Sequence, residues 1–319
     1  MPFQRIVTRT LPDRTVRKVY PFHISLEGMA SVLLCRCEED YDHLEKSFYI
    51  AALKANALVI IPIAMSNHGH ACILAPQMQT AVLMGELIKK RHGQYLSWKY
   101  GEKAVLARTS VDVQYLDSDW YVRNALAYVP RNALEAGSRV EDYRWSGYRG
   151  MFTGGRCPQG IRSVAAMSRR EREALFRTHE DLSQVPWMVN IDGNVEPASA
   201  CDYTYLESAF NHDQAFFLKT IGSLDPAEMR QKLILDKRNR QTDTQFLATV
   251  SHLAEKWYRK SIPELTMDMK ARLVSYLYRA YRTNPKQLAR CLQLSPEMVS
   301  EYLPRRSALP DVSSPLPQE

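Results

Sequence analysis

The chain has 319 residues, a formal net charge of +7 and 45% hydrophobic residues. This apolar fraction is enough to bury a core and argues against a wholly disordered chain. No apolar run approaches the length that spans a bilayer, and the basic amino terminus lacks the pattern of a secretory signal. We therefore expect a cytoplasmic protein with no membrane partner. Its six cysteines form no C-x-x-C pair, which indicates free thiols rather than a zinc ribbon.

The basic balance fits a polyanionic partner, because each phosphate neutralised by Lys or Arg releases counterions. Residues 1–18 are polar and basic and are interpreted as a basic arm. Within it, Arg14 and Arg17 are candidates to follow a DNA backbone; the alternative is a disordered tail that binds nothing.

Hydrophobic periodicity predicts an α+β fold for the first half of the chain, with an antiparallel sheet and flanking helices. Asp40 and Asp117 or Ser118 are the expected N-caps of two of the helices. In chain order, we expect a strand at 19–26, a helix at 40–55, a strand at 57–63, its hairpin partner at 68–75, a helix at 80–100, a strand at 111–115 and a helix from about 118 to Gly137.

The second half is predicted to be helical. Residues 153–202 are expected to be a linker with short helices, 203–306 a helical domain, and 307–319 a disordered tail rich in Pro and Ser. Residues 283–303 have the pattern of a helix-turn-helix, in which Ser295 caps the second helix. Ser300 and Arg305 would then face DNA; the alternative is a simple helical hairpin.

The segment His68-Gly69-His70 carries the first chemical signal. Alternate residues of a strand share one face, so the two imidazoles are expected to point the same way. Side chains about 7 Å apart along a strand can converge on one cation. The alternative is a pair of histidines that bind no metal.

Three segments together resemble one protein family. They are Met-Ser-Asn-His-Gly-His at 65–70, Tyr-Val-Pro-Arg-Asn-Ala-Leu-Glu-Ala-Gly at 128–137 and Asp-Tyr-Arg-Trp-Ser-Gly-Tyr at 142–148. Their order and spacing, over residues 19–152, resemble the REP-associated tyrosine transposases, which are single-tyrosine HUH transposases of the insertion-sequence 200/605 type. Each segment alone is a weak signal, and the specificity comes from their combination.

The resemblance implies an HUH endonuclease domain over 19–152, with a ferredoxin-like or RRM-like core. It implies Tyr128 as nucleophile, with His68, His70 and Asn132 as ligands of Mg²⁺ or Mn²⁺. Tyr128 and Asn132 also stand at i and i+4, hence on one helix face. The implied activity is nicking and strand transfer of single-stranded or hairpin DNA through a 5′-phosphotyrosine, by a monomer or a homodimer. The alternatives are a domesticated, non-cleaving DNA-binding regulator and a nuclease that releases its product by hydrolysis.

The chain departs from the family pattern at four positions. Gly69 replaces a bulky apolar residue, which suggests that a backbone or helix approaches closely there. Ser66 and Ala133 stand where the family has proline. Pro130 lies between the tyrosine and Asn132, and a kink at this proline would swing Asn132 off the metal. These departures raise the hypothesis of an altered or retired site.

A group of basic and aromatic side chains lies in the predicted helix at 80–100. Rings that stack on bases and cations that meet phosphates suit a single strand of DNA. The alternative is a solvated helix face over a core stripe. The candidate DNA-binding residues of this group are Lys89, Lys90, Arg91, Tyr95 and Trp98.

Overall fold

The computed structural model describes residues 3–27, 33–102, 106–107, 109–157, 161–223, 243–281, 283 and 285–303. They belong to two compact units that divide between residues 238 and 239. The predicted domain boundary at residue 203 differs from this division, because Tyr205 and Phe217 are buried in a core of the first unit. No helix within the described ranges is long and apolar enough to cross a membrane.

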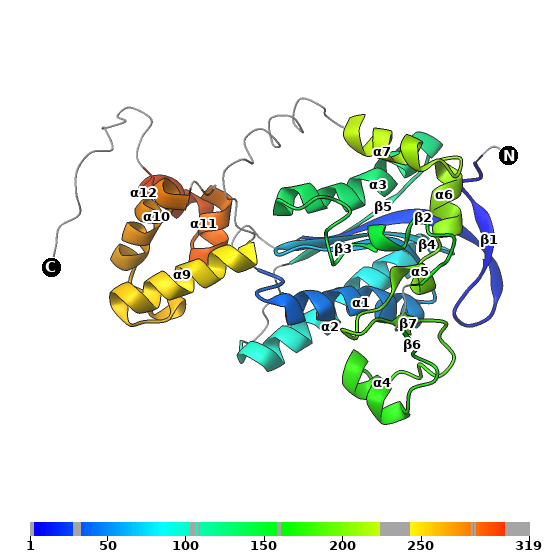
Figure 1. The fold of residues 1–319 in the computed structure, drawn as a ribbon, viewed down its shortest axis with the longest axis horizontal. Helices are drawn as coiled ribbons and strands as arrows, with labels where there is room; N and C mark the ends of the chain where they lie inside the picture. Colours follow the sequence, from blue (N-terminus) through cyan, green and yellow to red (C-terminus); the bar gives the residue numbers. More distant parts are fainter. Residues whose placement is uncertain are drawn as a thin grey trace. The chain divides into compact units, whose positions relative to one another are not determined.

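An antiparallel sheet forms the centre of the first unit, as the sequence predicts (Figure 1). The central strand β2 lies between β4 and β5, and β3 pairs with the other edge of β4. The order is therefore β5-β2-β4-β3. A helix connects β2 to β3 and a second helix connects β4 to β5. The elements are β2 (Val16–Glu27), α1 (Glu38–Ala55), β3 (Leu58–Ala64), β4 (His68–Ala75), α2 (Met78–Tyr100) and β5 (Ser110–Tyr115).

The two faces of the sheet are covered by different helices (Figure 1). Helices α1 and α2 pack on one face, where Ile24 and Ile73 of the strands join Phe48 and Ile88 of the helices in one core. Helix α3 (Asp119–Arg131) packs on the opposite face, in a second core. The alternation of side chains along each strand separates the two cores.

The amino-terminal segment forms a β-hairpin instead of the predicted basic arm. Strand β1 (Val7–Thr10) pairs with the start of β2, with Val7 opposite Val19. Leu11 and Val19 are buried, so apolar residues spaced among the basic ones tie this segment to the sheet. The density of arginines hid this pattern in the sequence.

The outer edge of β3 is bonded to segments distant in sequence. The Ala64 amide donates to the carbonyl of Trp145 at 3.0 Å, and Ile63 forms a bridge with Ser146. At the other end of the strand, the Asp202 amide donates to the carbonyl of Val59 at 2.8 Å. The Trp-Ser segment that contributed to the family resemblance therefore extends the sheet locally.

Short elements complete the first unit, and helices make up the described part of the second. In the first unit these are η1 (Asn132–Ala136), η2 (Gly147–Gly150), β6 (Arg162–Ser163), α4 (Arg169–Phe176), β7 (Met188–Val189), α5 (Pro197–Ala200), α6 (Tyr203–Ala209) and α7 (Gln214–Ser223). The second unit has α9 (Asp243–Tyr258), η3 (Ile262–Glu264), α10 (Met267–Tyr281), α11 (Pro285–Leu292) and α12 (Pro296–Tyr302).

The last two helices occupy the predicted helix-turn-helix segment. Leu288 and Leu292 of α11 and Val299 of α12 are buried together. Gln293 turns the chain with a left-handed φ of 54°, and the Ser295 hydroxyl accepts from the Met298 amide at 3.3 Å. The predicted turn and cap are confirmed, and DNA contact by these helices stays a prediction.

Asp40 is not the N-cap of α1, which begins at Glu38. Its carboxylate is fully buried between α1 and α2. It accepts from the Tyr95 hydroxyl at 3.0 Å, the Tyr100 hydroxyl at 2.7 Å and the Lys99 ammonium at 2.7 Å. These bonds satisfy a buried charge, which is why an aspartate is tolerated inside the helix pair.

Two buried histidines join the same helices. Nδ1 of His43 lies 3.1 Å from Nδ1 of His92, and Nε2 of His92 lies 2.7 Å from the carbonyl of Leu34. Burial lowers the pKa of His92 from 6.5 to about 4. Burial, and then the charge of His92, lowers the pKa of His43 as well. Both imidazoles are therefore neutral in the folded protein at neutral pH.

We predict that acid destabilises the fold through this pair. Below pH 6.5 the unfolded chain binds protons that the folded chain excludes, so stability is full above pH 6.5 and falls towards pH 4. At pH 5, His92 alone should cost about 2 kcal/mol of unfolding free energy. Urea unfolding between pH 7.5 and 5 measures this loss.

The pH dependence should be smaller in His92→Leu, although that variant is less stable at pH 7.5. His179→Gln, which alters an exposed histidine, serves as the matched control and should keep the pH dependence of the unmodified chain. An equal slope in His92→Leu and the unmodified chain would contradict the prediction.

Candidate functional site

Strand β4 brings the two predicted histidine ligands together on the face of the sheet that α3 covers. His70 is 3% exposed and His68 is half-buried, and their ring centroids are 5.0 Å apart. Gly69, between them, faces α1 on the other side of the sheet. The predicted alternation is therefore confirmed, since both imidazoles lie side by side on one face of the sheet.

Asn132 lies against this pair because α3 ends beside β4. Its Nδ2 donates to the carbonyls of Tyr128 at 2.9 Å and Val129 at 3.2 Å. These two bonds fix the orientation of the amide and direct its Oδ1 to Nε2 of His68, 3.2 Å away. Pro130 lies in the last turn of α3, where the helix passes into η1, and it does not swing Asn132 away.

The His68 ring has an oxygen atom close to each nitrogen. Nδ1 lies 3.1 Å from Oδ1 of Asn67, and Nε2 faces Oδ1 of Asn132. If Nδ1 donates to Asn67 in the neutral ring, lone pairs of Nε2 and of the amide oxygen face one another. A cation resolves this conflict, since two ligands at right angles, each about 2.1 Å from an ion, are roughly 3 Å apart.

His70 supplies a second nitrogen that can bind a cation. Its Nδ1 is buried and has no hydrogen-bond partner among the residues described. Burial, and then the charges of His68 and His23, lowers the pKa of His70 well below 6.5. The imidazole is therefore neutral at neutral pH, which is the form that ligates metals. No group of three His, Cys, Asp or Glu side chains suited to a metal occurs in the described ranges. The amide oxygen of Asn132, 3.2 Å from Nε2 of His68, is placed to serve as a third ligand.

Tyr128 lies on the same side of the site. Its side chain is 38% exposed, although its neighbours Ala127 and Val129 are buried. The ring stands edge-on to that of His70, with centroids 5.2 Å apart and an interplanar angle of 69°. A half-exposed phenol beside an imidazole pair can be reached by a substrate from solvent.

His23 is a site residue that sequence analysis did not find. Its ring stacks on that of His70, with centroids 5.1 Å apart, and meets the ring of Tyr128 edge-on at 6.0 Å. Strand β2 places it there because Ser25 pairs with His70 and His23 pairs with Cys72. The alternation in the segment 19–26 was a signal, but it could not tell which strand would lie alongside.

Some of the predicted DNA-binding residues of α2 are exposed, and others are buried or bonded within the protein. Lys90 and Trp98 are exposed, with Trp98 at 68%. Tyr95 is buried, and Arg91 donates to the carbonyls of Phe176 and Arg177. Lys89 is half-buried.

The other predicted DNA-binding residues lie elsewhere in the chain. Arg14 donates to Gln184 at 3.1 Å, and Arg17 donates to the Thr15 hydroxyl at 3.4 Å. Ser300 is exposed on α12. Arg305 lies outside the described residues. These contacts leave the predicted DNA binding as a prediction.

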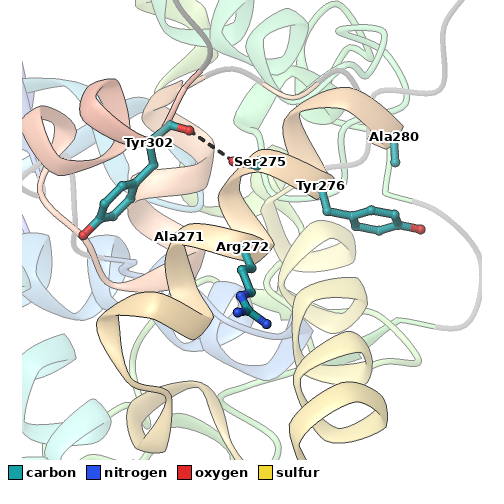
Figure 2. Close-up of a pocket in the computed structure, with 6 residues that line it drawn as sticks. All are labelled: Ala271, Arg272, Ser275, Tyr276, Ala280 and Tyr302. Atoms are coloured by element: carbon teal, nitrogen blue, oxygen red, sulfur yellow. Dashed lines mark hydrogen bonds between the residues drawn. The ribbon is translucent and has the colours of Figure 1, made fainter. Parts of the chain in front are cut away.

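The second unit has a cavity of its own, of about 660 Å³. Figure 2 shows that α10 and α12 line it, and that the Ser275 hydroxyl donates to the carbonyl of Tyr302, at 3.1 Å. Arg272 and Tyr276 give the lining one cation and one half-exposed ring. None of the residues predicted from the sequence lines this cavity.

Among known proteins, the chain has a distant similarity to a solved transposase structure. No protein-family model and no curated protein matches the chain. A solved structure of a REP-associated tyrosine transposase bound to a REP hairpin is similar at 16% sequence identity and a TM-score of 0.33. The match covers 43% of this chain and 81% of that one. At this level the likeness carries no argument about the site.

Gly69 is explained by a close approach of α1, as the sequence suggested. A Cβ at this position would lie 3.1 Å from Cζ of Phe48 and 3.7 Å from Cδ2 of Leu44. Glycine therefore lets α1 pack against the strand that carries both histidines. The departure from a bulky residue reflects packing beneath the site.

We predict that Gly69→Leu destabilises the first unit by about 1–3 kcal/mol, because it overpacks the interface with α1. Urea unfolding measures the change. Gly93→Ala in α2 is the matched control, since an added Cβ there makes only ordinary contacts at 3.6 Å. It should gain up to about 1 kcal/mol from helix propensity. Equal stability of Gly69→Leu and the unmodified chain would contradict the prediction, because it would show that Phe48 can move aside without cost.

Proposed function

We propose that this protein nicks and rejoins single-stranded DNA, with Tyr128 as its nucleophile. One observation carries the proposal: β4 and the end of α3 bring His68, His70, Asn132 and Tyr128 together. Two imidazoles, an oriented amide oxygen and an accessible phenol suit phosphoryl transfer. The substrate we propose is DNA with hairpin ends.

The reaction is a transesterification. The phenol oxygen of Tyr128 bonds to phosphorus, and the bond from phosphorus to the 3′-oxygen of the neighbouring nucleotide breaks. The phenol loses its proton and the leaving oxygen gains one, so the products are a 5′-phosphotyrosine and a free 3′-hydroxyl. One phosphodiester replaces another, and a second strand end can reverse the step without ATP.

The residues around Tyr128 fit a divalent cation. His68, His70 and Asn132 would hold Mg²⁺ or Mn²⁺, as supported by the orphaned Nδ1 of His70 and by the 3.2 Å between Nε2 of His68 and Oδ1 of Asn132. Bound there, the ion would neutralise charge on the phosphate. A free tyrosine is ionised to only about one part in a thousand at pH 7, so such help is needed.

The fold and the second unit are consistent with this role. We infer that the order β5-β2-β4-β3, with two helices on one face, corresponds to the ferredoxin-like arrangement. We also infer that α11 and α12 act as a helix-turn-helix and bind duplex DNA, with Ser300 on the exposed side. The acidic Glu297 and Glu301 on α12 would make that contact weak.

Tyr128→Phe should abolish the covalent adduct with DNA. The substitution removes only the attacking oxygen, so the ring contact with His70 and the stability should be kept. The measurement is a denaturing gel of end-labelled hairpins taken from the flanks of the gene, with Mn²⁺ and then with EDTA. Tyr121→Phe, on the same helix, is the matched control and should retain the adduct.

Other outcomes of this assay would favour the other functions. Cleavage that survives Tyr128→Phe but is lost in His68→Ala would indicate hydrolysis by water. DNA binding without cleavage, unchanged in both variants, would indicate a regulator that keeps only the fold.

Asn132→Ala should weaken Mn²⁺ binding by at least roughly tenfold, because it removes one of three ligands. Titration calorimetry on the Tyr128→Phe background measures the affinity without turnover. Asn124→Ala removes the same side chain two turns earlier on α3 and should leave the affinity unchanged. Tight Mn²⁺ binding by Asn132→Ala would exclude this residue as a ligand.

A further inference from the structure

A polar cavity lies on the face of the sheet opposite to Tyr128, between α1, α2 and the end of α4. Its volume is about 320 Å³, at the lower end of the range for small-molecule sites. It is too small for a double helix and large enough for one nucleotide. The residues that line it are His43, Arg91, Gln94, Tyr95, Trp98 and Arg177.

Two arginines line this cavity, and Arg91 brings it a positive charge. The terminal nitrogens of Arg91 donate to backbone carbonyls, which are neutral, so these bonds leave its charge in place. Arg177 pairs with Glu39 at 3.0 Å, but the same carboxylate also pairs with Lys99 at 3.0 Å. Lys99 is also paired with the buried Asp40 at 2.7 Å, so Glu39 and Asp40 together balance Arg177 and Lys99. The positive charge of the cavity that remains is that of Arg91. An anionic ligand is therefore favoured.

Aromatic rings form one wall of the cavity. Trp98 is 68% exposed, and the guanidinium of Arg177 lies 4.5 Å from its ring centroid and 5.5 Å from that of Tyr95. The flat face of an exposed indole ring suits stacking with a nucleobase. Arg177 adopts a left-handed φ of 48° at the end of α4, where Arg91 holds its carbonyl.

Besides its charges, the cavity has neutral side chains that can donate or accept hydrogen bonds. Nε2 of His92 must carry its proton, because it lies 2.7 Å from a carbonyl. In the neutral pair, His43 then donates from Nδ1 to His92, which leaves its Nε2 with a lone pair. Gln94 adds an amide that both donates and accepts. These groups can recognise the edge of a base.

The exposed face of α2 continues away from the cavity. Lys90, Gln94 and Trp98 stand at i, i+4 and i+8, hence on one face, and all three are exposed. They follow about 12 Å of helix. A cation, an amide and a ring in this order can follow a single strand.

We propose that this cavity binds one nucleotide of a single DNA strand, with its base against Trp98 and its phosphates near Arg177 and Lys90. This nucleotide site lies on the face of the sheet opposite to Tyr128. The inference does not depend on the chemistry proposed for Tyr128. It adds a second contact through which the protein selects unpaired DNA.

The test uses fluorescein-labelled single-stranded decamers and the full chain carrying Tyr128→Phe, so that no cleavage interferes. Trp98→Ala should weaken decamer binding, measured by anisotropy, by roughly five- to hundredfold. Gln94→Ala should weaken it less and should change the ranking of dA, dC, dG and dT decamers. Val82→Ala, also exposed on α2 but about 24 Å from Trp98, is the matched control and should stay within about twofold.

Competition and crosslinking separate the possible ligands. A decamer with 5-bromodeoxyuridine should crosslink under ultraviolet light to the peptide that contains Trp98. If dAMP or dTMP binds saturably and loses affinity in Trp98→Ala while decamer binding is unchanged, the site takes a free nucleotide and the assignment to a strand is wrong. If neither probe responds to Trp98→Ala, the site itself is disproved. If the unmodified chain forms no covalent adduct while Trp98→Ala still weakens decamer binding, only the function proposed for Tyr128 is disproved.

Discussion

The double hydrogen bond of the Asn132 amide is the constraint on which the candidate site depends. By donating to the carbonyls of Tyr128 and Val129, Nδ2 closes the end of α3 and leaves Oδ1 a single direction, towards His68. The same bonds tie the position of the tyrosine backbone to that of the histidine strand. A helix ending that satisfied its carbonyls in another way would separate the phenol from the imidazoles.

The sheet keeps two different chemistries apart. On the α3 face, imidazoles and an amide surround an accessible phenol, and burial keeps the His70 imidazole neutral by lowering its pKa. On the α1 and α2 face, shared carboxylates and arginines form a charged network that ends in the nucleotide site. Because alternate residues of one strand serve both sides, His70 and its neighbour Gly69 are constrained by unrelated partners.

Much of the fold and of the candidate site could be predicted from local patterns in the sequence. Alternation along 68–75 and the i, i+4 spacing of Tyr128 and Asn132 were readable because both are properties of a single element. What failed depended on pairing between distant segments. His23 reaches the site only through the register of β2 with β4, and Asp40 is buried by α2 instead of capping α1. The hairpin of β1 was hidden because its apolar residues are few and spaced among arginines.

The bonding along the outer edge of β3 limits how two copies of this chain can associate. An open strand edge is a template that recruits a strand from another molecule. Here the backbone of Val59 and Ala64 is already engaged by Asp202 and Trp145 of the same chain. Joining two sheets side by side through β3 would require these segments to peel away first. A homodimer of this protein would therefore be built through helix surfaces or another part of the sheet, with β3 protected from runaway strand addition.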